Sequence, residues 1–327
     1  MNDDLITILS EPGTGSPLSI HRVDERRGQH VWEGTLRSAT GRDYPVRRGI
    51  PRFVPEDSYA HNFGLQWNRF RREQLDTEQG GALSRKRFES ETGWSHSLAG
   101  KWVLDAGCGA GRFAEVAASY GARLVAVDIS SAVDATAESL AKYPQVDVVQ
   151  GDLLNLPIRH AAVDFAYCIG VVQHTPDRAR ALRSVVDAVR GGGEFAFTIY
   201  PRKPWTKLHA KYLARNVTKR LDPELLLAML ERVMPSLFAV GDRLFRLPGL
   251  GRVARFASPF AVYLESERPG WSRDQRYRES LLDTLDMLAP RFDEPMTEDE
   301  VRDALAPLGP TALRFTGIAG LNVVGVR

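Results

Sequence analysis

The stretch Val103–Phe113, VLDAGCGAGRF, decides the fold of this chain. Its first half continues an apolar run, so we expect a buried strand over Trp102–Ala106 and a helix over Gly111–Tyr120. The glycines between them let the backbone turn sharply and approach a ligand closely. Their spacing is G-x-G-x-G, whereas dinucleotide sites have G-x-G-x-x-G. The stretch therefore predicts a nucleotide-type ligand site without saying which ligand it takes.

Predicted strands and helices continue to alternate up to about residue 201. Apolar runs predict strands at Arg123–Asp128, Asp147–Gln150, Val163–Ile169 and Glu194–Tyr200. Periodic segments predict helices at Ser131–Tyr143 and Pro176–Arg190. Alternating strands and helices indicate crossover units and a parallel sheet covered on both faces.

The last thirty residues predict a closing unit for this sheet. Thr297 and Glu300 form a capping-box pattern at the start of a helix over Thr297–Leu308. Thr311–Thr316 and Leu321–Val326 then predict two strands, an antiparallel hairpin on the edge of the sheet.

Three carboxylates follow successive predicted strands and narrow the choice of ligand. Asp105 lies before the first glycine, where it would repel a pyrophosphate and attract an ammonium. Asp128 can accept hydrogen bonds from both hydroxyls of a ribose, and Asp152 from the exocyclic amine of an adenine. The alternative is that these aspartates cap helices or close turns.

Four motifs in this order resemble the successive motifs of class I S-adenosylmethionine (SAM)-dependent methyltransferases: DAGCGAG at 105–111, DIS at 128–130, GDLLNLP at 151–157 and GVVQHTPD at 170–177. The resemblance covers about residues 59–200 and the closing strands. It implies an α/β fold with a Rossmann-like, seven-stranded, mostly parallel sheet whose last strand is antiparallel, and SAM across the carboxyl ends of the strands. The residues that it assigns to SAM are Asp105, Gly107, Cys108, Gly109, Asp128, Ile129, Asp152, Leu153 and Gly170.

His174 is the candidate catalytic base. It follows the fourth strand, beside the expected position of the methyl group, and a histidine titrates in the range that proton abstraction needs. Similar methyltransferases often carry two adjacent histidines here, whereas this chain has Gln173-His174. The alternative is a histidine that caps the next helix or binds the backbone.

Aromatic residues on either side of the motifs are candidates for a lid or an acceptor pocket. Tyr59, Phe63 and Trp67 fall in a helical stretch before the first strand, and aromatic rings can cover an adenine or a sulfonium. Tyr200 and Tyr277 are further candidates. Ordinary packing of an amphipathic arm is the alternative for any one of the lid residues.

Residues 201–295 predict a mostly helical insertion that defines the acceptor. Lysine or arginine recurs every four residues, at Lys203, Lys207, Lys211, Arg215 and Lys219. On a helix these residues would form one stripe, which is either a solvated face or a dock for an anionic partner such as a phosphate-bearing substrate, an acyl carrier protein or a membrane surface. Weaker acceptor-pocket candidates before the last helix are Asp283, Asp286, Arg291 and Asp293.

The first 57 residues resemble a small zinc-ribbon module that has lost its cysteines. Residues 10–18 and 36–46 resemble its two knuckles, but no cysteine precedes Cys108, so we expect no metal. An unrelated strand-rich extension is the alternative. The expected organisation is this segment (1–57), a SAM-binding domain (58–200 and 296–327) and the insertion (201–295).

Composition excludes several other classes of protein. The chain has 327 residues, a net charge of +2 and two cysteines, so it indicates neither a nucleic-acid binder nor a disulfide framework. The start of the chain is unlike a signal peptide and no apolar run reaches the length of a membrane span, so we expect a cytoplasmic protein without stable membrane insertion.

The expected activity is methyl transfer from SAM to an oxygen or nitrogen of a small molecule. We expect this acceptor to belong to secondary metabolism and to be anionic or carrier-bound. Three alternatives stay open: a SAM-binding enzyme of another reaction type such as a cyclase or isomerase, a non-catalytic binding protein, and a nicotinamide oxidoreductase. The sequence leaves the oligomeric state undetermined.

Overall fold

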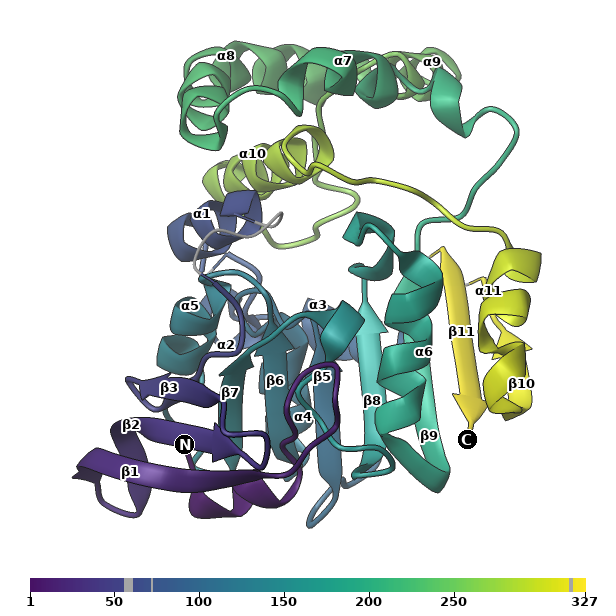
Figure 1. Ribbon diagram of the computed structural model, residues 1–327. Helices are drawn as coiled ribbons and strands as arrows, with labels where there is room; N and C mark the ends of the chain where they lie inside the picture. Colours follow the sequence, from purple (N-terminus) through teal and green to yellow (C-terminus); the bar gives the residue numbers. More distant parts are fainter. Residues whose placement is uncertain (56–60, 72, 318–319) are drawn as a thin grey trace.

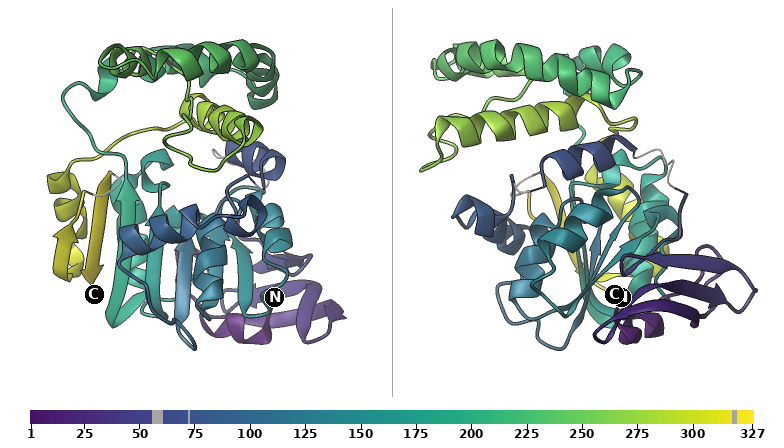
Figure 2. Two further views of the ribbon diagram at one scale, coloured as in Figure 1. Left: turned by 180° about the vertical axis from the view of Figure 1, so that it is seen from behind. Right: turned by 90° about the vertical axis from the view of Figure 1, so that its left-hand side faces the viewer.

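The computed structural model describes residues 1–55, 61–71, 73–317 and 320–327. A seven-stranded sheet lies between two layers of helices, and a small four-stranded sheet lies beside it (Figure 1). A group of helices from the insertion stands beyond one end of the large sheet, at the top of Figures 1 and 2. Among the candidates from the sequence, Tyr59 lies outside the described residues.

The large sheet has the strand order β10-β11-β9-β8-β5-β6-β7. Its strands are β5 (Trp102–Ala106), β6 (Arg123–Asp128), β7 (Val146–Gln150), β8 (Val163–Ile169), β9 (Val189–Ile199), β10 (Thr311–Phe315) and β11 (Leu321–Val326). The first five are parallel, and β11 is antiparallel to both β9 and β10. The predicted mostly parallel sheet with an antiparallel last strand is therefore confirmed.

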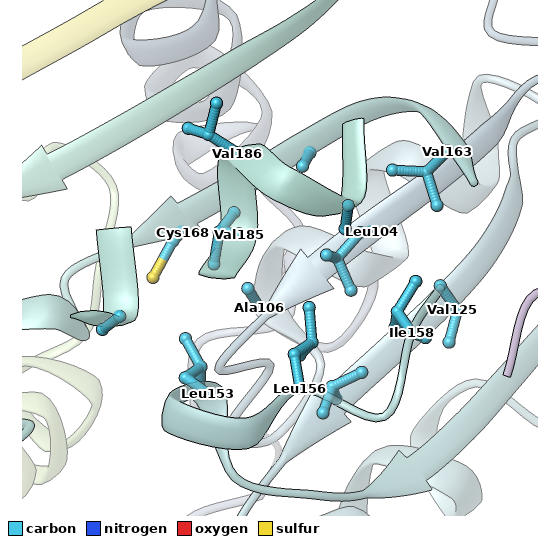
Figure 3. Close-up of a cluster of buried hydrophobic side chains, with 14 of the residues drawn as sticks. Leu104, Ala106, Val125, Leu153, Leu156, Ile158, Val163, Cys168, Val185 and Val186 are labelled. Carbon is cyan, nitrogen blue, oxygen red and sulfur yellow. The ribbon is translucent and has the colours of Figure 1, made fainter. Parts of the chain in front are cut away.

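Buried strands place alternate side chains in two separate cores. On one face, Val103 and Leu124 pack under helices α3 (Leu83–Thr92), α4 (Arg112–Ser119) and α5 (Ala132–Ser139). On the other face, Leu104 and Val125 pack under α6 (Arg178–Ala188) and α11 (Glu298–Leu305), as Figure 3 shows for part of this core. The capping box at the start of α11 is present as predicted.

Some boundaries differ from those that periodicity predicts. The helix expected to reach Tyr143 ends at Ser139, and β9 already begins at Val189, where a helix was expected. The strand β1 (Leu18–Arg27) was missed because most of its side chains are polar and exposed, so it lacks an apolar alternation. The chain begins with a 3₁₀ helix over Asp3–Thr7, and Leu9 then forms an isolated antiparallel bridge with Ile158.

The N-terminal sheet consists of β1, β2 (His30–Ser38), β3 (Asp43–Arg47) and β4 (Ile50–Pro51), all antiparallel. It shares the core of the large sheet, because Leu36 is fully buried in the same apolar cluster as Leu104. The Phe53 amide donates to the Gln150 carbonyl over 2.8 Å, which joins the end of this unit to β7.

A buried carboxylate links residues 10–18 to residues 36–46, the two segments that resemble zinc-ribbon knuckles. Glu11 accepts hydrogen bonds from the hydroxyls of Thr14 (2.7 Å), Ser38 (3.3 Å), Thr40 (2.9 Å) and Tyr44 (3.2 Å). These bonds, that of Thr14 first, lower the pKa of Glu11. One carboxylate thus holds these two segments together through hydrogen bonds. The expectation that it binds no metal stays a prediction.

The insertion forms four helices: α7 (Ala210–Thr218), α8 (Pro223–Leu244), α9 (Leu250–Phe256) and α10 (Arg273–Leu288). α10 lies between the other three and the sheet (Figure 1) and packs on α8 through Leu230, Met234, Leu281 and Leu285. Within the part of the chain that the structure describes, no helix combines the length and the apolar character that a membrane span requires.

We predict that Glu11→Gln lowers the urea midpoint at pH 7, because an amide is a weaker acceptor for four hydroxyls. Since the pKa of Glu11 is lowered in the folded state, its contribution is present above the ordinary glutamate pKa and is lost as the pH falls through the lowered value. The difference between wild type and variant in urea unfolding should therefore shrink at pH 3. Equal differences at both values of pH would contradict this role, and Glu25→Gln, on the exposed strand β1, is the control.

Candidate functional site

A cavity of about 560 Å³ lies at the carboxyl ends of the parallel strands. Its volume is in the range of small-molecule sites. The sequence candidates that line it are Gly107, Cys108, Gly109, Asp128, Ile129, Leu153, Gly170, His174, Phe63, Trp67 and Tyr200. Asp105, Asp152 and Tyr277 do not line it. The structure thus brings together motifs that lie more than 60 residues apart.

The glycine loop after β5 has a backbone conformation in which neighbouring atoms can come close to it. Gly107 has φ +90°, and a Cβ atom there would lie 2.6 Å from the Val171 methyl groups. A Cβ atom on Gly109, at φ +53°, would lie 3.0 Å from the Trp67 indole nitrogen. Only glycine fits these two positions without strain. The amides of Gly107 and Cys108 both donate to the Val127 carbonyl, which holds the loop against β6.

Asp128 connects the loops after β5 and β6. One carboxylate oxygen accepts from the Gly109 amide over 3.1 Å, and the other accepts from the Ser130 amide (2.9 Å) and hydroxyl (2.7 Å). The side chain is buried, and this burial raises the pKa of Asp128. The carboxylate stays at the cavity wall, where it can accept further hydrogen bonds from a ligand.

Asp105 lies beneath the glycine loop rather than in the cavity wall. Its Oδ2 atom is buried and has no hydrogen-bond partner among the described residues. Burial raises the pKa of Asp105 to about 8, and the nearby Asp128 adds to the rise while Tyr167 opposes it. Such an unpartnered carboxylate indicates that a group outside the protein, or a water, completes its environment.

The loop after β7 places one of its two candidates in the cavity. The Asp152 carboxylate caps the short 3₁₀ helix Leu153–Asn155 by accepting from the Leu154 amide over 2.9 Å. Leu153 itself is buried and lines the cavity. Asp152 therefore caps a helix, which was the alternative to its binding an adenine. A carboxylate that caps a helix can still accept a second hydrogen bond from a ligand.

His174 ends a 3₁₀ turn after β8 and lines the cavity. Nδ1 lies 2.9 Å from the Phe292 carbonyl oxygen, which can only accept, so Nδ1 carries the proton. Nε2 is buried and has no partner among the described residues. The rings of Phe63 (5.2 Å) and Tyr200 (5.7 Å) meet the imidazole edge-on and fix its orientation.

The insertion supplies a second, charged wall that the sequence only partly indicates. Asp283 and Asp286 on α10, both weak candidates, line the cavity together with the unpredicted Tyr263, Arg268 and Glu279. Arg268 forms a two-pronged ion pair with Glu279, with bonds of 2.6 and 3.1 Å. No local pattern marks these three residues, because only the packing of α10 places them here.

Asp283 in this wall and Arg112 at the start of α4 both have shifted pKa values. Burial raises the pKa of Asp283 to about 7, and Glu279 adds to the rise, while a hydrogen bond from the Tyr263 hydroxyl opposes it. Burial lowers the pKa of Arg112 to about 10, and neighbouring Arg87 acts in the same direction. Arg112 directly follows the glycine loop in sequence. This position is the feature from which the sequence could have identified Arg112 as a site residue.

The basic stripe is not continuous, which corrects the expectation of one helical stripe. The chain forms loops and a 3₁₀ turn (Thr206–Leu208) before α7 begins at Ala210. Lys211 and Arg215 then point inward: Lys211 Nζ lies 2.9 Å from Asp293, and Arg215 donates to the carbonyls of Met287 and Pro290. Asp293 therefore anchors α7 and does not line the cavity, and neither do Arg291 and Tyr277.

A family model described as "Methyltransferase domain" matches residues 104–197, which span β5 to β9 and carry the glycine loop, Asp128 and His174. The chain contains a class I SAM-dependent methyltransferase domain. Its cofactor is accordingly SAM. The match covers the sheet and loops that form one wall of the cavity, whereas the N-terminal sheet and the insertion lie outside it.

Relatives of the methyltransferase domain carry related names. A "Probable S-adenosylmethionine-dependent methyltransferase" from Mycolicibacterium smegmatis is 29% identical over 64% of this chain and 81% of its own length. A ubiquinone biosynthesis O-methyltransferase from Citrobacter koseri is 34% identical over 38% of this chain, which spans only about half (54%) of that relative. A structure from Methanococcus maripaludis, described as an S-adenosylmethionine-dependent methyltransferase, aligns over 84% of this chain and 96% of its own, with 14% identity and a TM-score of 0.43.

We predict that Asp128→Asn weakens SAM binding about 10- to 100-fold, because hydrogen bonds to a charged group are each worth about 1.5–3 kcal/mol. Isothermal titration calorimetry measures the affinity, and a thermal melt checks that the loop hydrogen bonds still support the fold. Asp24→Asn, an exposed carboxylate on β1, is the matched control. Unchanged SAM affinity in Asp128→Asn would remove Asp128 from the cofactor site.

Proposed function

We propose that this methyltransferase domain transfers the SAM methyl group to an oxygen or nitrogen of a small molecule held between His174 and the insertion. The observation that carries the proposal is the unpartnered Nε2 of His174 beside the glycine loop. The Phe292 carbonyl holds the proton on Nδ1, so Nε2 is left as a proton acceptor. A base in this position suits an acceptor that loses a proton as it gains a methyl group.

The cofactor half of the cavity fits SAM on several observations. Gly107 and Gly109 line the cavity without side chains, and the buried Asp105 oxygen lacks a partner among the described residues. We assign the methionine end to Asp105 and the glycine loop, the ribose to Asp128, and the adenine to Asp152 and Leu153. Cys108, Ile129 and Gly170 complete the wall. Phe63 and Trp67 on α1 (His61–Arg69) close the site from above.

Bound SAM supplies a methyl group that its sulfonium charge already activates. The protein's task is to align the acceptor, exclude water and take up one proton. Bound SAM would give up the methyl group and keep the electron pair of the broken carbon–sulfur bond on sulfur, and Nε2 of His174 would take up the proton that the acceptor atom loses. Tyr200 and Phe63 restrain the ring at this moment because both contact it edge-on.

The charged groups that line the cavity indicate which chemical class of acceptor it can bind. Asp283, with a pKa near 7, and the Tyr263 hydroxyl can donate or accept hydrogen bonds, and Arg112, on α4 beside the glycine loop, supplies positive charge. We infer a polar acceptor with hydroxyl or amine groups and an anionic substituent. A carrier-bound or secondary-metabolite acceptor fits this description.

We predict that His174→Ala lowers kcat by about 100-fold or more and leaves SAM affinity within about twofold, because the ring acts on the acceptor proton. Single-turnover assays with methyl-labelled SAM measure the step, and His160→Ala, whose ring lies outside the cavity, is the control. Near-normal turnover in His174→Ala would remove it as the base. Substrate conversion without transferred label would instead favour a cyclase or isomerase.

We also predict that SAM binding at pH 7 releases about one proton. The pKa of Asp105, about 8 in the free protein, leaves it mostly protonated at pH 7, and the ammonium of SAM favours its charged form. Calorimetry in two buffers of different ionisation enthalpy measures the release, and Asp105→Asn should abolish it. A binding enthalpy that is independent of the buffer in the wild type would contradict the assignment of Asp105.

A further inference from the structure

Nearly all strongly exposed large apolar side chains of this protein lie on one layer of helices. Among the described residues, the exception is Val23 on β1. The others belong to α7, α8, α9 and the segments that flank them: Trp205, Leu208, Leu213, Val217, Leu225, Met229, Val233, Val240, Leu247, Leu250, Val253 and Phe256. Exposed apolar side chains that gather on one layer of helices indicate an interaction site.

The helix α8 has two apolar faces instead of one. Leu230 and Met234 are buried against α10. Leu225, Met229 and Val233 recur every four residues on a different face, which is exposed and has no partner among the described residues. A surface helix of a globular protein normally needs one apolar stripe, so the second stripe calls for a partner outside the chain.

The neighbouring helices present apolar side chains to the same outer layer. On α7, Leu213 and Val217 lie opposite Arg215, which is buried towards the end of α10. On α9, Val253 is 65% exposed and Phe256 39%. The three helices form the layer of the molecule farthest from the N-terminal sheet, at the top of both views in Figure 2.

This layer is strongly basic. Residues 202–256 contain twelve Lys or Arg and four Asp or Glu, a net charge of +8 in a chain whose total is +2. Seven of these cations form no ion pair with a described carboxylate: Lys203, Lys207, Lys219, Arg220, Arg232, Arg243 and Arg252. Apolar and basic side chains together are typical of helices that lie in the interface of an anionic membrane.

We propose that the outer face of α7, α8 and α9 docks on the surface of an anionic lipid bilayer. Such a surface offers phosphate headgroups to the cations and a shallow apolar layer to the leucine, valine and phenylalanine side chains. A second copy of this chain is the weaker occupant, because two facing layers of charge +8 would repel each other. The protein would bind the bilayer surface peripherally, through the exposed faces of these helices.

Docking would bring the lipid surface close to the insertion that forms one wall of the cavity. α10 packs on α8 through Leu281 and Leu285, and it contributes Asp283 and Met287 to the cavity. The inference does not depend on the reaction, because it rests on the outer face of the insertion and on no residue of the cavity.

Co-sedimentation of the full chain with vesicles tests the proposal. We expect binding to equimolar phosphatidylglycerol and phosphatidylcholine vesicles, little binding to phosphatidylcholine alone, and a loss of binding at high salt. Leu213→Ser/Val217→Ser and Lys219→Gln/Arg220→Gln/Arg252→Gln should each weaken binding about 10-fold or more. SAM binding by calorimetry reports on the fold of every variant.

The controls are Val23→Ser, an exposed apolar residue outside the layer, and Lys86→Gln/Lys101→Gln, two exposed cations on the methyltransferase domain. Both should bind vesicles as the wild type does. Absence of binding to either vesicle, or equal binding by all variants, would overturn the proposal. So would self-association in sedimentation equilibrium that Leu213→Ser/Val217→Ser abolishes without any binding to vesicles, since the face would then join two copies of the chain.

Discussion

The hydrogen bonds of one buried carboxylate hold the centre of this protein together. Asp128, at the end of β6, accepts from the Gly109 amide in the loop after β5 and from Ser130 in its own loop. Parallel strands end at the same edge, so two loops from different crossover units can share one side chain. If this link were absent, the glycine loop would lose its position against β6, and the cavity wall that carries it would change shape.

A second constraint is the path of the chain after β9. The insertion leaves the sheet at the edge of the cavity and returns through Phe292, whose carbonyl fixes the tautomer of His174. Lys211 and Arg215 on α7 are tied to Asp293 and to the end of α10, which holds this return segment in place. The orientation of the candidate base therefore depends on packing within a segment that lies outside the matched domain.

Local patterns were sufficient for much of the fold. Apolar runs of strand length, the glycines at 107–111 and the capping box at Thr297 predicted the parallel sheet, the turn and the last helix, because each depends on neighbours in sequence. Most residues proposed for the cofactor line the cavity, since a residue that follows a buried parallel strand must lie at the ligand edge of the sheet. The polar strand β1 was missed because its exposed side chains carry no periodic signal.

The sequence by itself determined the class of fold, the SAM-type loops and the position of His174 after its strand, because these follow from short-range periodicity and turn chemistry. Tertiary structure alone decided that Glu11 links residues 10–18 to residues 36–46, that Lys211 and Arg215 point inward, and that α10 lines the cavity. The reason is physical: the face that a helix buries, and the partner that a carboxylate finds, depend on side chains far away in the sequence.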